Sequence, residues 1–180
     1  MFLTYLLLLL PQSPSVIGTE GLQAAERGLA WLAQQQLPDG SWPSDVGYKL
    51  EEGYQVWNPS SPHVGVTALA GMAFLAGGHV PKRGPYGRVV ESATDFLLKN
   101  IRADGYITAN ETRMYSHAFA TLFLAEVYGM NQRKDVRQAL QKAVNLIVVS
   151  QNQQGGWRYQ PHVEDSDMSV AACQVMALRA

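Results

Sequence analysis

Apolar and polar positions from Leu22 onward follow two kinds of helical pattern. In the first kind, apolar residues recur at steps of three and four with charged residues between them, as at Leu22, Ala25, Leu29 and Leu32. The segments 89–101 and 136–147 repeat this pattern. Such spacing predicts amphipathic helices that bury one face and leave the other in water.

The second kind of pattern carries no charge at all. It covers the segments 64–76, 116–125 and 168–178, which consist mainly of Ala, Gly, Val, Leu, Met and Phe. A helix that is apolar on every side must be surrounded by other helices or by lipid, and these runs are too short to cross a bilayer. The sequence therefore predicts interior helices, in the order outer, inner, repeated three times as helical hairpins.

A repeated turn follows each amphipathic segment. The stretches from Gln36 to Trp42 and from Gln151 to Trp157 share the form Q-x-x-x-G-x-W, and the middle turn has Tyr106-Ile107 in place of the final pair. Repeats of about 50 to 65 residues that each hold one outer and one inner helix stack side by side, and they close into a ring when the inner helices converge. The stretch 43–61 is expected to be a long loop inserted in the first hairpin. Long loops of this kind are often functional, but this one contains no recognised site.

The N-terminal segment 1–18 stands apart from the domain, which we place at 19–180. Residues 2–10 form an apolar run that is too short to span a bilayer but suits the apolar part of a secretory signal. Against a signal, no Lys or Arg precedes Arg27 and no A-x-A cleavage site is present. Two alternatives stay open: export to the periplasm or association with a membrane, or a cytoplasmic protein in which this segment is a helix.

Composition and charge exclude several classes of protein. A net charge of −1, from 14 basic and 15 acidic residues, gives no basic surface for nucleic acid. The lone Cys173 excludes an internal disulfide framework and a cysteine-rich zinc module, and the four histidines lack ligand spacing. The sequence also has no phosphate-binding loop, no G-x-G-x-x-G after a strand and no G-x-S-x-G elbow, so no cofactor and no metal are expected.

The helical alternation and the two Q-x-x-x-G-x-W turns resemble the terpenoid cyclase and protein prenyltransferase superfamily, which includes the prenyltransferase and squalene oxidase repeat. The resemblance covers about residues 20–180 and implies an all-α fold, the α/α toroid. The chain would supply three outer/inner hairpins, half of a six-hairpin ring. Either a C-terminal half or self-association would then complete the ring. In that family the motif Gln and Trp clamp helix ends together.

An acidic stretch at the start of the last apolar segment resembles the Asp-x-Asp-Asp-Thr-Ala motif of squalene–hopene cyclases. Asp165 and Asp167 match its first two acids, whereas Met168 replaces the third. The resemblance implies that Asp167 protonates a double bond and that Asp165 tunes its acidity, since neighbouring carboxyls split their pKa values. The alternative is that these residues only cap the helix.

Aromatic residues near this stretch complete the candidate site. Tyr115, His117, Trp157 and Tyr159 are expected to contact the substrate, and ring faces stabilise carbocations. The alternative for each is a place in the core. The leading hypothesis is an isoprenoid cyclase or transferase domain, like squalene–hopene cyclase, that binds a long apolar substrate. The competing hypothesis is a non-catalytic toroid that binds a ligand or a protein partner, and Cys173 argues against a zinc-dependent prenyltransferase.

Overall fold

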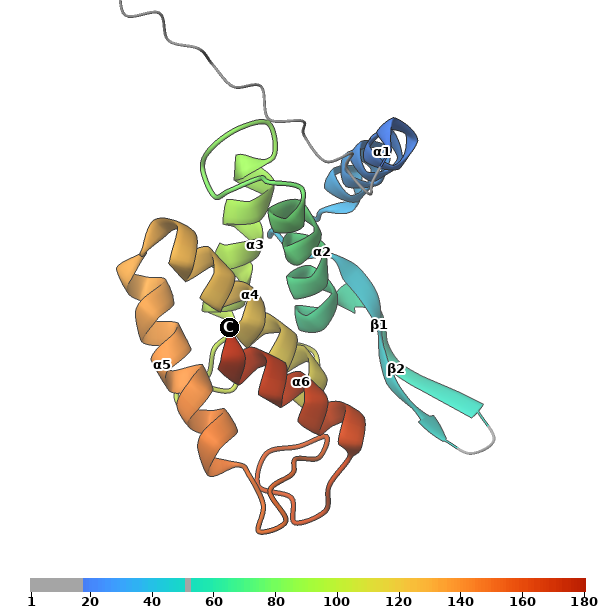
Figure 1. The fold of residues 1–180 in the computed structure, drawn as a ribbon. Helices are drawn as coiled ribbons and strands as arrows, with labels where there is room; N and C mark the ends of the chain where they lie inside the picture. The colour runs from blue at the N-terminus through green and yellow to red at the C-terminus, as the bar shows by residue number, and fades with distance from the viewer. Residues whose placement is uncertain (1–17, 51–52) are drawn as a thin grey trace, which may run out of the picture.

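The computed structural model describes residues 18–50 and 53–180, so the predicted signal segment lies outside the described residues apart from Gly18. The described part forms six helices and a two-stranded sheet (Figure 1). In chain order these are α1 (Thr19–Gln35), β1 (Pro43–Leu50), β2 (Gly53–Pro62), α2 (Val64–Ala76), α3 (Gly87–Lys99), α4 (Met114–Asn131), α5 (Lys134–Val149) and α6 (Met168–Arg179).

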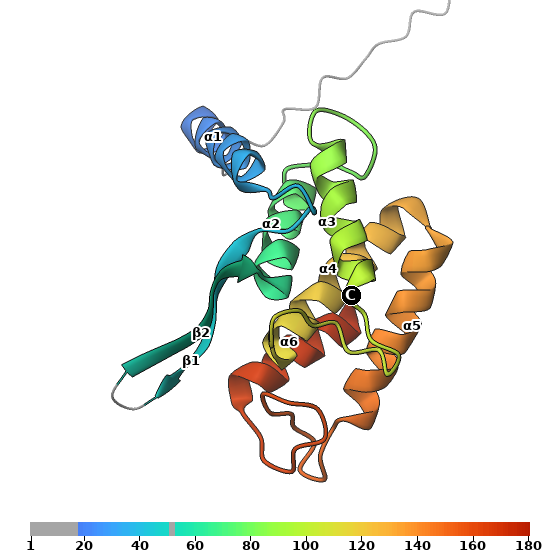
Figure 2. The ribbon, with the colours of Figure 1, turned by 180° about the vertical axis from the view of Figure 1, so that it is seen from behind.

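The helices alternate between an inner and an outer position, as the sequence predicts. The inner helices α2, α4 and α6 pack against one another in that order, with α4 in the middle. The outer helices α3 and α5 pack against α2 and α4 respectively, and α1 touches α2 (Figures 1 and 2). Each outer helix is followed along the chain by an inner one, which gives three hairpins in the described part.

The core lies where α2 and α4 meet their neighbours. Phe74 of α2 and Phe123 of α4 are fully buried, and Ala93 of α3 and Ile147 of α5 turn the predicted apolar faces of the outer helices inward. Burying one large apolar side chain contributes about 1.5–3 kcal/mol. The helices are therefore held together mainly by this packing, since their individual propensities are modest.

The prediction that every uncharged segment is fully surrounded is wrong for α6. Its inward side buries Val170, Gln174 and Ala177, but Val175 and Met176 are exposed. Helix α1 likewise buries only Leu29. Charge content alone indicated burial, but an apolar face becomes buried only where another helix packs on it.

The turns after α1 and α5 have the same geometry. The indole Nε1 of Trp42 donates to the carbonyl of Leu32 at 2.8 Å, and that of Trp157 donates to the carbonyl of Ile147 at 2.8 Å. Each indole thus satisfies a carbonyl near the end of its own outer helix, which has no partner within the helix. The turn residues form a structural clamp at the helix end.

The stretch 43–61 is a β-hairpin, so the prediction of a loop and of an all-α fold is wrong here. Strands β1 and β2 pair antiparallel from Pro43 opposite Pro62, with register shifts around Val46. Apolar residues alternate with polar or small ones at Val46, Tyr48 and Leu50 and again at Tyr54 and Val56, which is a strand signal that the length of the insertion obscured. The hairpin projects away from the helices beside α2 (Figures 1 and 2).

Candidate functional site

The predicted site residues lie at the end of the molecule where the inner helices begin. His63, Arg113 and Asp167 immediately precede α2, α4 and α6. The base of the β-hairpin and the loops 100–113 and 150–167 surround this end. Backbone N–H groups at a helix start have no partner in the helix, so this end favours carboxylates and other acceptors.

Asp167 is the N-cap of α6. Its Oδ1 accepts hydrogen bonds from the backbone N–H of Ser169 at 2.9 Å and of Val170 at 3.1 Å, and also from the Ser169 hydroxyl. These bonds stabilise the charged carboxylate, the Ser169 hydroxyl most and the Val170 N–H next, and they lower the pKa of Asp167 to about 2. The expected helix cap is confirmed, and the same bonds make this carboxyl a strong acid.

Two tyrosines extend this hydrogen-bond network. The Tyr159 hydroxyl donates to Asp167 Oδ2 at 3.1 Å, and the Tyr115 hydroxyl lies 3.5 Å from Oδ1 and also bonds to Ser169. The two tyrosine rings stack with centroids 6.2 Å apart. The pKa of Tyr159 is raised, chiefly because its hydroxyl donates to the carboxylate. The structure thus brings Tyr115, Tyr159 and Asp167 into one cluster.

Asp165 reaches this cluster only through an arginine. Arg158 Nη1 lies 3.4 Å from Asp165 Oδ2 and 4.0 Å from Asp167 Oδ2, so one guanidinium faces both carboxylates. The Asp165 side chain is 70% exposed, and its Oδ1 accepts from the backbone N–H of Ser166. An ion pair this exposed contributes little to stability, and its effect is on the charge around Asp167.

Cations already lie against the aromatic rings of this site. The guanidinium carbon of Arg158 is 4.6 Å from the centroid of the Tyr159 ring, and that of Arg113 is 6.0 Å from it. Arg113 is also 5.4 Å from the centroid of the Trp57 ring. Contacts of this length are within the range of cation–π attraction, so the Tyr159 ring presents its π-system where positive charge can bind.

Trp157 and His117, the other predicted substrate contacts, lie in the interior. Trp157 is the clamp of the third turn. His117 is fully buried, and its Nδ1 accepts from the backbone N–H of Ile107 at 3.2 Å while Nε2 lies 3.3 Å from the carbonyl of Ala143. Burial lowers the pKa of His117 to about 4, so the ring is neutral near pH 7. Both side chains bond to backbone groups and not to the cluster around Asp167.

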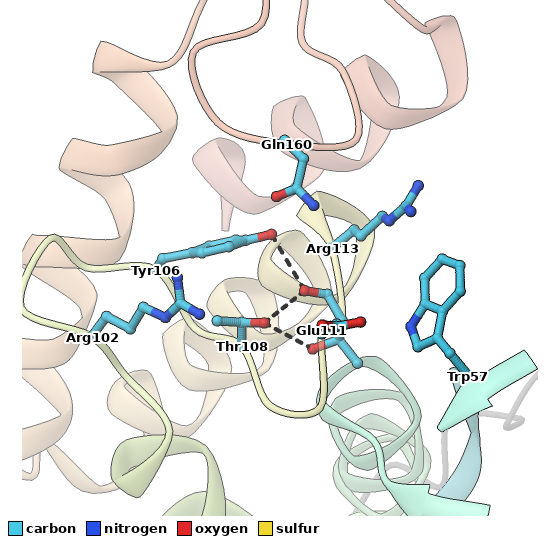
Figure 3. Close-up of a pocket in the computed structure, with 8 residues that line it drawn as sticks. Trp57, Arg102, Tyr106, Thr108, Glu111, Arg113 and Gln160 are labelled. Atoms are coloured by element: carbon cyan, nitrogen blue, oxygen red, sulfur yellow. Dashed lines mark hydrogen bonds between the residues drawn. The ribbon is translucent and has the colours of Figure 1, made fainter. Parts of the chain in front are cut away.

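A polar hollow of about 390 Å³ opens beside this cluster (Figure 3). Trp57 reaches it from β2, Gln160 from the loop before α6, and Tyr106 from the loop before α4. The Thr108 hydroxyl donates to the carbonyl of Thr112 at 2.6 Å and fixes the floor of the hollow. The remaining lining residues are Arg102, Glu111 and Arg113.

No pattern in the sequence indicates this hollow. Its residues come from three separate segments and share no spacing or motif that would group them. Arg102 and Trp57 were visible only as isolated residues in loops. The sequence held no signal that could have joined them, since only the fold brings the three segments together.

The solved structures of similar fold include three of the type II terpene cyclase MstE from Scytonema. One, in complex with geranylgeranyl dihydroxybenzoate, is 20% identical over 76% of this chain, with a TM-score of 0.55. A second, in complex with merosterolic acid A, is 18% identical over 87% of this chain, with a TM-score of 0.61. A third, in complex with geranylgeranyl dihydroxybenzoate, is 17% identical over 87% of this chain, with a TM-score of 0.60. The matches span 34%, 49% and 49% of those chains, so this chain covers a third to a half of their length.

These similarities define the class of fold: the helical part of the chain is terpenoid-cyclase-like. No protein-family model and no curated protein sequence matches the chain. Within the described residues, no three His, Cys, Asp or Glu side chains are grouped so that they could hold a metal ion. No helix in the described ranges has the length and apolar character to cross a membrane.

Proposed function

We propose that the chain is the half of an α/α toroid of the terpenoid-cyclase type that binds a long apolar isoprenoid and starts its cyclisation by protonation, as squalene–hopene cyclases do. The observation that carries the proposal is the environment of Asp167. This carboxyl stands at the start of an inner helix, beside Arg158 and within hydrogen-bond reach of the hydroxyls of Tyr115, Tyr159 and Ser169. The solved structures of similar fold hold a prenylated substrate or its product, which agrees with an isoprenoid ligand.

In the proposed step, Asp167 transfers a proton to a double bond. The carboxyl O–H bond breaks, a C–H bond forms, and the neighbouring carbon becomes positively charged. The next double bond attacks this carbon and closes a ring, which moves the positive charge to a carbon of that double bond. The final cation then loses a proton to a base, which gives a neutral product. A carboxyl with a pKa of about 2 is a strong acid but is ionised at neutral pH. An apolar substrate that excludes water would raise this pKa and favour the protonated form.

The other predicted residues take supporting roles in this proposal. Asp165 competes with Asp167 for Arg158, so its negative charge disfavours ionisation of the donor. Tyr115 and Tyr159 contact the substrate and stabilise the cation through their rings, an effect of about 0.5–2 kcal/mol per contact. Trp157 and His117 act from the interior by fixing the loop and the helix that carry these tyrosines.

A second candidate function is a non-catalytic toroid that binds the same class of ligand. The capping bonds of Asp167 favour it, because they suffice to explain the residue without catalysis. Met168, in the position of the third acid, is exposed and points to the same conclusion. The two candidates differ in turnover and not in binding.

The test is incubation of the full-length protein with squalene, followed by gas chromatography and mass spectrometry. The proposal expects cyclised product, a loss of about 10²-fold or more in Asp167→Asn, and a smaller loss in Asp165→Asn. Asn caps helices as well as Asp does, so Asp167→Asn should keep its fold, which circular dichroism checks. Binding of squalene without product would support the second candidate, and failure of the folded wild-type protein to bind squalene would rule out both.

A further inference from the structure

The three hairpins of the chain contact one another through a repeated interface. The turn after each outer helix contains a glycine with positive φ, at Gly40, Gly105 and Gly155. At Gly40 an added Cβ would lie 2.2 Å from the backbone oxygen of Ser92 in α3, and at Gly105 it would lie 2.3 Å from that of Lys142 in α5. The first two turns therefore rest directly on the next outer helix.

The third turn has the same shape but no such neighbour. Among the described residues nothing lies within 4 Å of a Cβ built on Gly155. Gln36 of the first turn donates to the carbonyl of Gly40 and also to that of Val89 in the next outer helix, at 2.9 Å. Gln151 of the third turn makes the matching bond to Gly155, at 2.9 Å. The turn 151–157 is thus built to receive an outer helix.

Helix α1 has the complementary surface. Twelve residues before the turn glycines, Ala93 of α3 and Ala143 of α5 are fully buried, whereas no described atom lies within 4 Å of a Cβ built on Gly28 of α1. Nine residues before the same glycines, α3 and α5 bury a large apolar residue, about one helical turn after the residue that the preceding turn touches. These residues are Phe96 and Leu146, and the matching residue of α1 is Trp31, which is 60% exposed. Helix α1 therefore presents the surface that α3 and α5 use to receive a turn.

The inner helices give a second, independent comparison. The first, eighth and eleventh residues of α2 are buried, and so are the first, eighth and eleventh residues of α4. These residues are Val64, Gly71 and Phe74 in α2, and Met114, Thr121 and Leu124 in α4. In α6 the same positions are exposed, with Met168 at 90% and Val175 at 51%, and Leu178 exposed as well. In α2 and α4 the next hairpin along the chain covers this face of the helix. In α6 the same face, together with the turn 151–157, is left uncovered by the described residues.

An apolar groove of about 550 Å³ runs between α1 and α2. Leu22, Leu29 and Leu32 line it from α1, and Ala73 and Ala76 line it from α2. Within the chain, an inner helix packs against the next outer helix and the next inner helix at once, as α2 does with α3 and α4. The groove between α1 and α2 corresponds to the place between α3 and α4 against which α2 packs. An inner helix such as α6 therefore fits the groove.

We propose that the chain associates head to tail with a second copy of itself. The α6 face and the turn 151–157 of one copy dock on α1 and α2 of the other, with Trp31 under the turn and α6 in the groove. Because the surfaces differ, the contact is heterologous, and two copies close when both contacts form. The start of α2 of the second copy then lies beside Asp167, as the start of α4 does within the chain. The inference depends on the packing and holds whether or not the protein is a cyclase.

The test uses the full-length protein in light scattering after size exclusion, at about 1 to 100 µM. The expected mass is about twice the 19.8 kDa of the chain. Val175→Asp on α6 and Trp31→Asp on α1 should each give a monomer, because a buried unpaired carboxylate disrupts an interface. An equimolar mixture of the two variants should recover a dimer, since one intact pair of surfaces remains.

The matched control is Val149→Asp. Val149 is 53% exposed, and Val175 is exposed to a similar extent, at 51%. The residues at the same position in the other outer helices, Lys99 and Gln34, face water. The Val149→Asp variant should therefore stay dimeric. A wild-type protein that remains a monomer at the highest concentration overturns the proposal and leaves the groove to another partner. A dimer that survives both Val175→Asp and Trp31→Asp, or a mixture that stays monomeric, overturns it too.

Discussion

Asp167 combines two roles through one set of hydrogen bonds. The N–H groups that it caps and the hydroxyl of Ser169 stabilise its charge, so the bonds that begin helix α6 also make the carboxyl a strong acid. In the folded protein this pKa lies below its ordinary value, so the stability from this cap is present above about pH 4 and is lost as pH falls toward 2. Asp167→Asn separates the two roles, because Asn can still cap the helix but has no carboxyl proton to donate.

His117 gives a prediction in a different pH range. Its pKa is about 4 in the folded protein and 6.5 when solvated, so between these values the unfolded chain binds a proton that the folded chain does not. The free energy of unfolding should therefore fall as pH drops from 7 toward 4, by up to about 3 kcal/mol. Urea denaturation at pH 7, 6 and 5 measures it.

The control for this prediction is His117→Gln. Gln can still accept from the N–H of Ile107 and donate toward the carbonyl of Ala143, but it does not titrate. The pH dependence between 7 and 5 should therefore become clearly smaller in this variant, and His63, whose pKa burial also lowers, accounts for part of what remains. An equal slope in both proteins would assign the effect to another group.

Residue-level predictions from the sequence succeeded where a local rule applies. The cap at Asp167 follows from an acidic residue before an apolar run, and Tyr115 lies beside Asp167 because both stand at inner-helix starts. His117 stands one turn into its helix and was expected to face a ligand. Which face of a helix points inward depends on the neighbours, and a single uncharged segment does not contain that information.

At the level of elements, two of the turn glycines distinguish the cost of a positive φ from the cost of a steric clash with the next helix. Gly105→Ala places a Cβ at positive φ and also 2.3 Å from the backbone of α5, whereas Gly155→Ala has only the positive φ. We expect Gly155→Ala to lower the free energy of unfolding by about 1–2 kcal/mol and Gly105→Ala by clearly more. Thermal denaturation of the two variants at low concentration tests this, and equal losses would contradict the close turn–helix contact.

The elements themselves were largely predictable. Each segment with a helical pattern of apolar residues forms a helix whose ends lie within a few residues of the prediction. An apolar face that repeats every 3.6 residues fits few structures other than a helix. The exception is the hairpin of β1 and β2. Its alternating pattern was present in the sequence, and its two strands follow each other directly along the chain, but the helical segments on both sides favoured the interpretation of a loop.

Over the whole molecule, burial is greatest in the middle hairpin and declines toward α1 and α6. Helix α4 packs against helices on both sides, while α1 buries only Leu29. Segments with few buried contacts open more easily. In dilute protein, amide hydrogens of α1 and α6 should therefore exchange faster than those of α2 and α4, as measured by mass spectrometry.

Concentration supplies the control for this experiment. If two copies cover the α6 face and the groove beside α1, exchange in α1 and α6 should slow as concentration rises, whereas exchange in α3 should not change. Uniform exchange across all six described helices would contradict the uneven packing. Slowing that occurs equally in the Val175→Asp variant would contradict the proposed assembly.

The β-hairpin leaves and re-enters the helical body through one pair of neighbouring residues, Pro43 and Pro62. Its two ends therefore stay adjacent however many rungs the arm gains or loses, and the register of the helices does not depend on its length. Related scaffolds could diversify this arm without redesigning their cores. A reporter peptide inserted in this arm should be displayed on the protein without changing the fold of the helices.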